Sequence, residues 1–131
     1  MSNKLDKILA EISAGELLDK IAILEIKKNK IKDGNKLKSI DKELLSLKKT
    51  FDNYIKNSHE LQFLIDNLKK INLQLWNIED GKRLAEKNNN FDDNFIQLAR
   101  NVYKLNDERA NIKLKINEML GSNIKEVKSY V

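Results

Sequence analysis

Apolar side chains recur at alternating spacings of three and four residues through four long segments of the chain. This period places them on one stripe of an α-helix and is typical of helices buried along one face. The stripes cover residues 17–31, 37–54, 61–78 and 95–119. In the second and third segments the spacing is that of a heptad seam, as in coiled coils. We therefore expect an all-α protein.

Local signals between the stripes predict where the helices begin and end. Ser13-Ala14-Gly15-Glu16 matches a capping box, in which the Ser13 hydroxyl accepts a backbone N–H and the Glu16 carboxylate reaches back to the cap. Asp33-Gly34 predicts a turn, with Gly34 as a left-handed residue after the first helix. Gly81 predicts either a bend or the close approach of another backbone. The remaining boundaries are a cap at Asn57-Ser58, a loop at 88–90, a cap at Asn90 or Asp92, and an end at Gly121.

Four helices with short connections predict an antiparallel four-helix bundle with up-down-up-down topology, formed by one domain over residues 1–131. Residues 1–12 and 122–131 lie outside the stripes and predict short terminal arms, the second of them either a short packed helix or a docked arm. Some apolar residues lie off the main seams, and one small bundle cannot bury all of them. These residues are Ile23, Ile26, Phe63, Ile65 and Leu73. We therefore expect a homodimer.

The composition disfavours several kinds of chemistry. The chain has no cysteine, which removes disulfides and thiolate chemistry, and His59 is its only histidine. Because His59 lies at a predicted helix start among polar residues, a Ser-His-Asp triad is not expected. No phosphate-binding glycine loop is present, and we expect no cofactor and no metal site. The chain shows neither a membrane-length apolar run nor a signal peptide, so we expect a cytoplasmic protein without a membrane partner.

The net charge of +5 and the pI near 9.3 are compatible with nucleic-acid binding, but the kind and distribution of the positive residues argue against it. Nearly all the positive charge is lysine, spread along every helix and interleaved with acids. Arginine, which favours base reading and bidentate phosphate capture, occurs only at positions 83, 100 and 109. We do not expect a nucleic-acid partner.

The candidate site consists of polar and aromatic residues on the facing parts of the third and fourth helices. Helical spacing gathers them on one side of each helix. They are Trp76, Glu79, Asp80 and Arg83 on the third helix, and Arg100, Tyr103, Arg109 and Lys113 on the fourth. An antiparallel hairpin that turns near residues 89–90 sets Glu79 and Asp80 level with Arg100, and Trp76 level with Tyr103. This arrangement predicts either a pocket for a small anionic ligand or, as we favour, a Glu79–Arg100 clamp of the hairpin.

Arg109 occupies a seam position between apolar neighbours, where an unpaired charge would cost several kcal/mol. It must therefore meet an acid or reach solvent. In antiparallel helices, residues equally distant from the connecting turn lie side by side. When this rule is applied to each turn in succession, Arg109 lies nearest Glu25, Asp41 and Glu43, and Lys113 lies near Asp19. A buried ion pair that fixes helix register and a functional charge are both consistent with this placement.

Several segments together resemble a family of short bacterial proteins classed as a domain of unknown function. They are Gly15-Glu16-Leu17-Leu18-Asp19-Lys20-Ile21 with Ile23-Leu24-Glu25-Ile26-Lys27, Leu75-Trp76-Asn77-Ile78-Glu79-Asp80, Phe95-Ile96-Gln97-Leu98-Ala99-Arg100, Asn106-Asp107-Glu108-Arg109-Ala110 and Lys128-Ser129-Tyr130. The resemblance spans nearly the whole chain but implies no activity, ligand or catalytic residue. Two families of small helical enzymes match less well: the all-α chorismate mutases differ in their N-terminal pattern, and the nucleotide pyrophosphohydrolases need a second acidic motif beyond Glu16-x-x-Asp19.

Our leading hypothesis is a non-enzymatic helical binding or assembly module that forms homo-oligomers and has a polar cluster fixing its helix pairing. The alternative is an anion-binding protein or an enzyme acting on a phosphorylated or nucleotide-sugar metabolite. In that alternative the arginines and Lys113 contact the anion, and Glu79 or Asp80 serves as acid, base or metal ligand. The expected partner is accordingly a protein, including a second copy, or a small anionic ligand.

Overall fold

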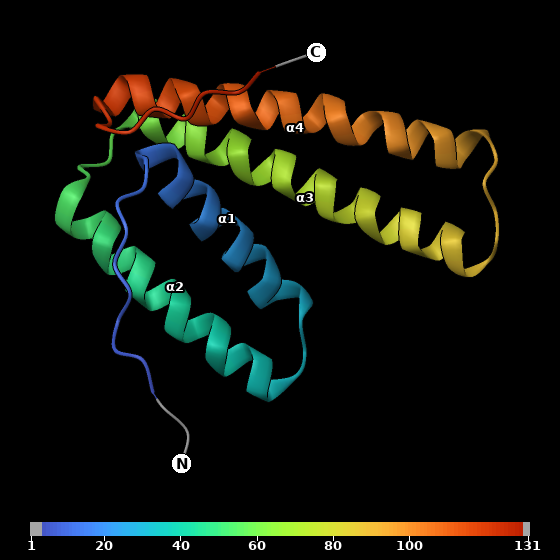
Figure 1. The fold of residues 1–131 in the computed structure, drawn as a ribbon, viewed down its shortest axis with the longest axis horizontal. Helices are drawn as coiled ribbons and strands as arrows, with labels where there is room; N and C mark the ends of the chain where they lie inside the picture. The colour runs from blue at the N-terminus through green and yellow to red at the C-terminus, as the bar shows by residue number, and fades with distance from the viewer. Residues whose placement is uncertain (1–3, 130–131) are drawn as a thin grey trace.

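The computed structural model describes residues 4–129, and in this range the regular secondary structure is entirely α-helical (Figure 1). The helices are α1 (Ala14–Lys30), α2 (Gly34–Tyr54), α3 (His59–Lys87) and α4 (Asp93–Leu120). The all-α class and the four-helix bundle are confirmed. The parts of the predicted arms at residues 1–3 and 130–131 lie outside the described residues.

Most predicted helix ends are confirmed by their caps. The Ser58 hydroxyl accepts the N–H of Leu61, and Asp92 rather than Asn90 caps α4 by accepting two backbone N–H groups. Gly121 ends α4 in the left-handed conformation, with φ of 61°. These ends follow from local chemistry, because each cap satisfies backbone groups that the helix itself leaves unpaired.

Three local predictions were wrong in part. Gly34 is not a left-handed residue but the first residue of α2, with Asp33 as its N-cap, and α1 ends through an extended Ile31. At α1 the Ser13 hydroxyl accepts the Glu16 N–H, but the Glu16 carboxylate pairs with lysines instead of returning to the cap. α3 continues through Gly81, where an added Cβ would meet a side-chain carbon of α4 at 3.2 Å rather than a backbone.

The helices form two hairpins, α1–α2 and α3–α4, with α1 in the central position. α1 packs against each of the other three helices, whereas within residues 4–129 the backbone of α2 closely approaches only that of α1. In Figure 1 the α3–α4 pair extends well past α1 and α2 toward the α3–α4 turn. None of the helices in the described range is long and apolar enough to cross a membrane.

The buried core lies where α1 packs on α2, on the first half of α3 and on the last turns of α4. Its apolar members are Leu17, Leu18, Ile21, Leu24, Ile40, Leu44, Leu61, Ile65, Leu68 and Ile116. A fully buried side chain of this kind stabilises the fold by about 1.5 to 3 kcal/mol. The second half of α3 and the first half of α4 lie away from this core and contribute no fully buried side chain among the described residues.

Candidate functional site

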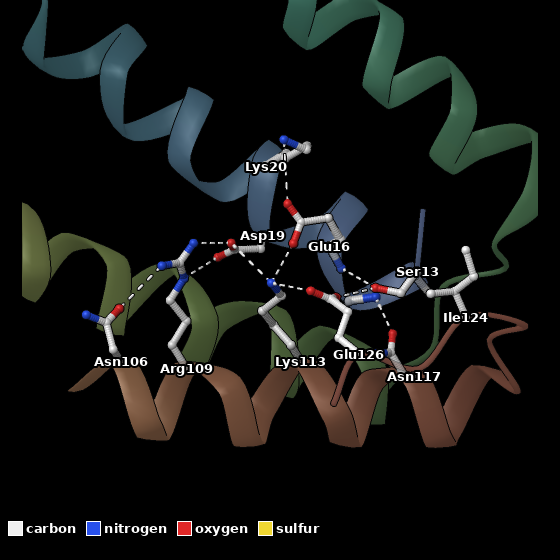
Figure 2. Close-up of polar contacts among 12 residues, drawn as sticks. Ser13, Glu16, Asp19, Lys20, Asn106, Arg109, Lys113, Asn117, Ile124 and Glu126 are labelled. Atoms are coloured by element: carbon white, nitrogen blue, oxygen red, sulfur yellow. Dashed lines mark hydrogen bonds and ion pairs between the residues drawn. The ribbon is translucent and has the colours of Figure 1, made fainter. Parts of the chain in front are cut away.

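A buried carboxylate on α1 is the centre of the polar cluster (Figure 2). Only 1% of Asp19 is exposed, and its Oδ1 accepts hydrogen bonds from Arg109 Nε at 2.9 Å and from Asn72 Nδ2 at 2.8 Å. The second guanidinium nitrogen of Arg109 donates to Asp19 Oδ2, which makes the pair bidentate. One carboxylate thereby joins α1 to both α3 and α4, and its burial is compensated by charge-assisted hydrogen bonds.

Lys113, one turn beyond Arg109 on α4, lies among three carboxylates. Its Nζ donates to Glu16 Oε2 at 2.5 Å, lies 3.9 Å from Asp19 Oδ2, and donates to Glu126 Oε2 at 3.4 Å. The Lys113 side chain is only 14% exposed. The network therefore balances three cations, including Lys20, with three acids.

The protonation states follow from these contacts. Burial disfavours the charged form of Glu16, but the hydrogen bond from Lys113 and attraction to Lys113 and Lys20 outweigh it, so the pKa of Glu16 is lowered. Burial likewise opposes the charge on Lys113, but its hydrogen bond to Glu16 and the nearby acids raise its pKa. The hydrogen bonds from Arg109 to Asp19 raise the pKa of Arg109.

The first turn of α1 obtains its hydrogen-bond acceptors from distant parts of the chain. The N–H of Ala14 donates to Ser122 Oγ at 3.1 Å, and the N–H of Gly15 donates to Asn117 Oδ1 at 2.6 Å. A Cβ at Gly15 would lie 2.5 Å from the backbone oxygen of Lys113, so glycine permits the close contact of α1 with α4. The Ser13 hydroxyl in turn donates to Glu126 Oε1 at 2.6 Å.

The predicted acidic partners of Arg109 were wrong. Glu25 pairs with Lys48 and Lys69, and Asp41 pairs with Lys28, whereas Arg109 binds Asp19. The prediction matched residues across each turn in chain order, from α4 through α3 and α2 to α1. Because α1 packs directly on α4, this procedure overestimates the distance between Asp19 and Arg109. The predicted proximity of Lys113 to Asp19 is confirmed.

Five of the eight candidate residues line a cleft of about 450 Å³ between α1, α3 and α4. They are Trp76, Glu79, Asp80, Arg83 and Arg109, and apolar side chains of α1 complete the wall. Arg100, Tyr103 and Lys113 do not line this cleft. Within residues 4–129 no ion pair joins Glu79 to Arg100, and Glu79 pairs instead with Lys82 at 3.4 Å.

A second hollow, of about 500 Å³, lies between α4 and the C-terminal residues 126–128. Asn117 lines it and is 1% exposed, and its Nδ2 has no hydrogen-bond partner in the described structure. Sequence reasoning missed Ser122, Glu126 and Asn117 as members of the cluster. No periodicity marks the first two, and Asn117 offered only one signal, a polar residue beside the apolar Ile116.

Comparison with known proteins identifies one family. The model of a family of unknown function, DUF6165, matches residues 8–131. No curated protein and no solved structure matches the chain.

Proposed function

This chain belongs to DUF6165, a family of unknown function, and because that membership assigns no activity, we propose from the geometry that it is a non-enzymatic helical assembly module. In this proposal two copies dimerise through the half of the α3–α4 hairpin nearer its turn, which begins beside the last turns of α1 and continues past α1 and α2. We call residues 73–105 the projecting hairpin. The observation that carries the proposal is the set of apolar side chains exposed on this segment.

The closed ion pairs support a structural role for the polar cluster. Arg109 is held by Asp19, which is buried, and Lys113 is held by Glu16. An external anion at Arg109 would have to displace a buried carboxylate and leave it unpaired, which costs several kcal/mol. Arg109 therefore serves better as a clamp between α1 and α4 than as a ligand contact.

The projecting hairpin exposes several large apolar side chains. Large apolar side chains on it are 40 to 60% exposed, namely Leu73, Leu84, Phe91, Ile96 and Tyr103. Leu73 and Leu84 are about three helical turns apart, and Ile96 and Tyr103 about two, so each pair lies on one face of its helix. Two helices without a third layer leave such faces uncovered, and a second hairpin related by a two-fold axis would complete a four-helix arrangement.

Sedimentation equilibrium tests this proposal. We expect wild-type protein at twice the chain mass of 15.2 kDa, and Leu84→Glu and Ile96→Glu at the monomer mass with unchanged helical circular dichroism. Leu45→Glu is the matched control, because Leu45 is 59% exposed on α2, away from the projecting hairpin, and should leave the dimer intact. A monomeric wild type at the highest soluble concentration would contradict the proposal, as would dissociation by Leu45→Glu alone.

A second candidate function is supported by the cleft beside Trp76. Arg83 lines this cleft and forms no ion pair within the described range, so its guanidinium is available to a phosphate or carboxylate. Trp76 supplies a half-buried aromatic wall, and Glu79 and Asp80 lie on the same side, where they can serve as acid, base or metal ligand. In this candidate the cleft accepts a phosphorylated or nucleotide-sugar metabolite, and Arg100 and Tyr103 lie outside it.

A thermal-shift screen tests the cleft with nucleotides, sugar nucleotides, phosphorylated sugars and small dicarboxylates. A compound present at about one hundred times its Kd adds about 2.7 kcal/mol to the stability. We expect Arg83→Ala to abolish the shift and Arg100→Ala, the control outside the cleft, to retain it. If no compound shifts the Tm, or if the shift survives Arg83→Ala, the cleft is not a ligand site.

A further inference from the structure

The C-terminal arm, residues 122–129, places a carboxylate at the start of α1. The arm has no regular secondary structure and runs back along α4 (Figure 1). Its Glu126 accepts a hydrogen bond from the Ser13 hydroxyl at 2.6 Å and another from Lys113 Nζ at 3.4 Å (Figure 2). The positive end of the α1 dipole favours a negative group at this position.

One residue that lines the hollow beside Glu126 has a buried hydrogen-bond donor without an acceptor. Asn117 lines the hollow, and its Oδ1 is used by the Gly15 N–H, while its buried Nδ2 has no partner among residues 4–129. A buried donor left unpaired costs about 1 to 3 kcal/mol. Because Nδ2 is buried, an acceptor in the hollow reaches it only when neighbouring side chains move aside, and such an acceptor would remove this cost.

The attachment of the arm is mostly polar and exposed. Glu126 is 45% exposed in its ion pair, Lys128 is 44% exposed in its pair with Asp107, and Val127 is 94% exposed. Exposed ion pairs of this kind contribute about 0 to 1 kcal/mol each. When the Glu126 carboxylate leaves its site, it loses these exposed pairs and the hydrogen bond from the buried Ser13 hydroxyl, but no residue of the apolar core belongs to the described arm.

We propose that this hollow is an anion-binding site for a carboxylate or phosphate group, and that Glu126 occupies it as an internal competitor. The donors for an external anion would be the Lys113 ammonium and the Asn117 amide, whose residues line the hollow. The Ser13 hydroxyl, which does not line it, becomes available only where the Glu126 carboxylate leaves. The volume of about 500 Å³ falls within the range of small-molecule sites, about 300 to 1,000 Å³. The hollow shares Asn106 and Arg109 with the cleft beside Trp76, but Lys113, Asn117 and Glu126 line only the hollow. The proposal does not depend on the proposed function.

Isothermal titration calorimetry at constant ionic strength tests the site, with inorganic phosphate and succinate as separate probes. Glu126→Gln keeps the shape of the side chain but removes its charge, and should bind one of the probes about tenfold more tightly than wild type, as expected for the loss of a competing ion pair. Glu118→Gln is the matched control, since Glu118 is exposed on α4 and does not line the hollow. The probe that binds identifies the chemistry of the ligand.

Two further variants, made in the Glu126→Gln background, decide whether binding occurs at the hollow. Asn117→Asp keeps an acceptor for the Gly15 N–H but replaces the orphan donor with a carboxylate oxygen, and Lys113→Gln removes the ammonium. Both should abolish binding, and Lys113→Gln alone locates the site if Asn117→Asp does not fold. The proposal is overturned if neither probe binds, if Glu118→Gln matches Glu126→Gln, or if binding survives the loss of Lys113.

Discussion

Asp19 and Arg109 are ninety positions apart in the sequence and meet as a bidentate ion pair between α1 and α4. The Asp19 carboxylate is 1% exposed and also accepts a hydrogen bond from Asn72 of α3. Three helices therefore share one buried charge, and this charge is stable only while all its hydrogen-bond donors stay in place.

Replacing Arg109 with methionine should strongly destabilise the protein, because it leaves the Asp19 charge buried. Removal of one partner of a buried ion pair costs about 3 to 5 kcal/mol, and the 28% exposure of the Arg109 side chain favours the lower end of that range. Urea denaturation measures the loss. Lys48→Met is the control, because it removes one exposed partner of Glu25 and should cost less than about 1 kcal/mol. Equal effects of the two variants would show that the pair with Asp19 is not a clamp.

Gly15→Ala should destabilise the fold by about 1 to 3 kcal/mol through overpacking. The new Cβ would lie 2.5 Å from the backbone oxygen of Lys113, so α1 and α4 would have to separate. Gly34→Ala is the matched control, since nothing lies within 4 Å of a Cβ there and the helix gains about 0.5 to 1 kcal/mol. Thermal melts of the two variants should shift in opposite directions, and an unchanged Tm for Gly15→Ala would contradict the close packing.

Ser13→Ala should cost more stability than Ser58→Ala, although both serines are N-caps. Each hydroxyl accepts a backbone N–H at 3.1 Å, a contact worth about 1 kcal/mol. Ser13 is 1% exposed and in addition donates to Glu126. We expect a loss of about 2 kcal/mol for Ser13→Ala in chemical denaturation, because both contacts disappear. A smaller loss than for Ser58→Ala would mean that the contact with Glu126 adds nothing to stability.

The stability of the Lys113 network should depend on pH at both extremes. The pKa of Glu16 is lowered in the folded state, so its contribution is present above its ordinary value of 4.5 and is lost as the pH falls through the folded pKa. The pKa of Lys113 is raised, so its contribution is present below 10.5 and is lost as the pH rises through the folded pKa.

Comparison of wild type with Lys113→Met across pH checks this dependence. The difference in unfolding free energy should be largest between about pH 5 and 10, where all members of the network are charged, and should shrink toward about pH 3. Urea midpoints at each pH give the difference directly. If the difference in unfolding free energy stays constant down to about pH 3, Lys113 contributes through packing rather than through charge.

The helices and most of their ends could be predicted from the amino-acid sequence alone. The apolar period marks the helices, and the caps at Ser13, Ser58, Asp92 and Gly121 are confirmed because each involves only neighbouring residues. Gly34 is the exception, and a local contact also explains it. The Asp33 side chain caps α2, so Gly34 is the first residue of that helix rather than a left-handed residue. For Arg109 the sequence established only that a charge on an apolar seam needs a partner.

Which groups meet depends instead on the tertiary packing. Arg109 binds Asp19 because α1 packs directly on α4, an arrangement that depends on the whole core and not on residues near either side chain. The start of α1 shows the same division. Its unpaired N–H groups are implied by any helix, but their acceptors at Asn117 and Ser122 come from more than one hundred positions away. Local backbone chemistry sets the need for a partner, and only the packing of the helices determines which partner is within hydrogen-bonding distance.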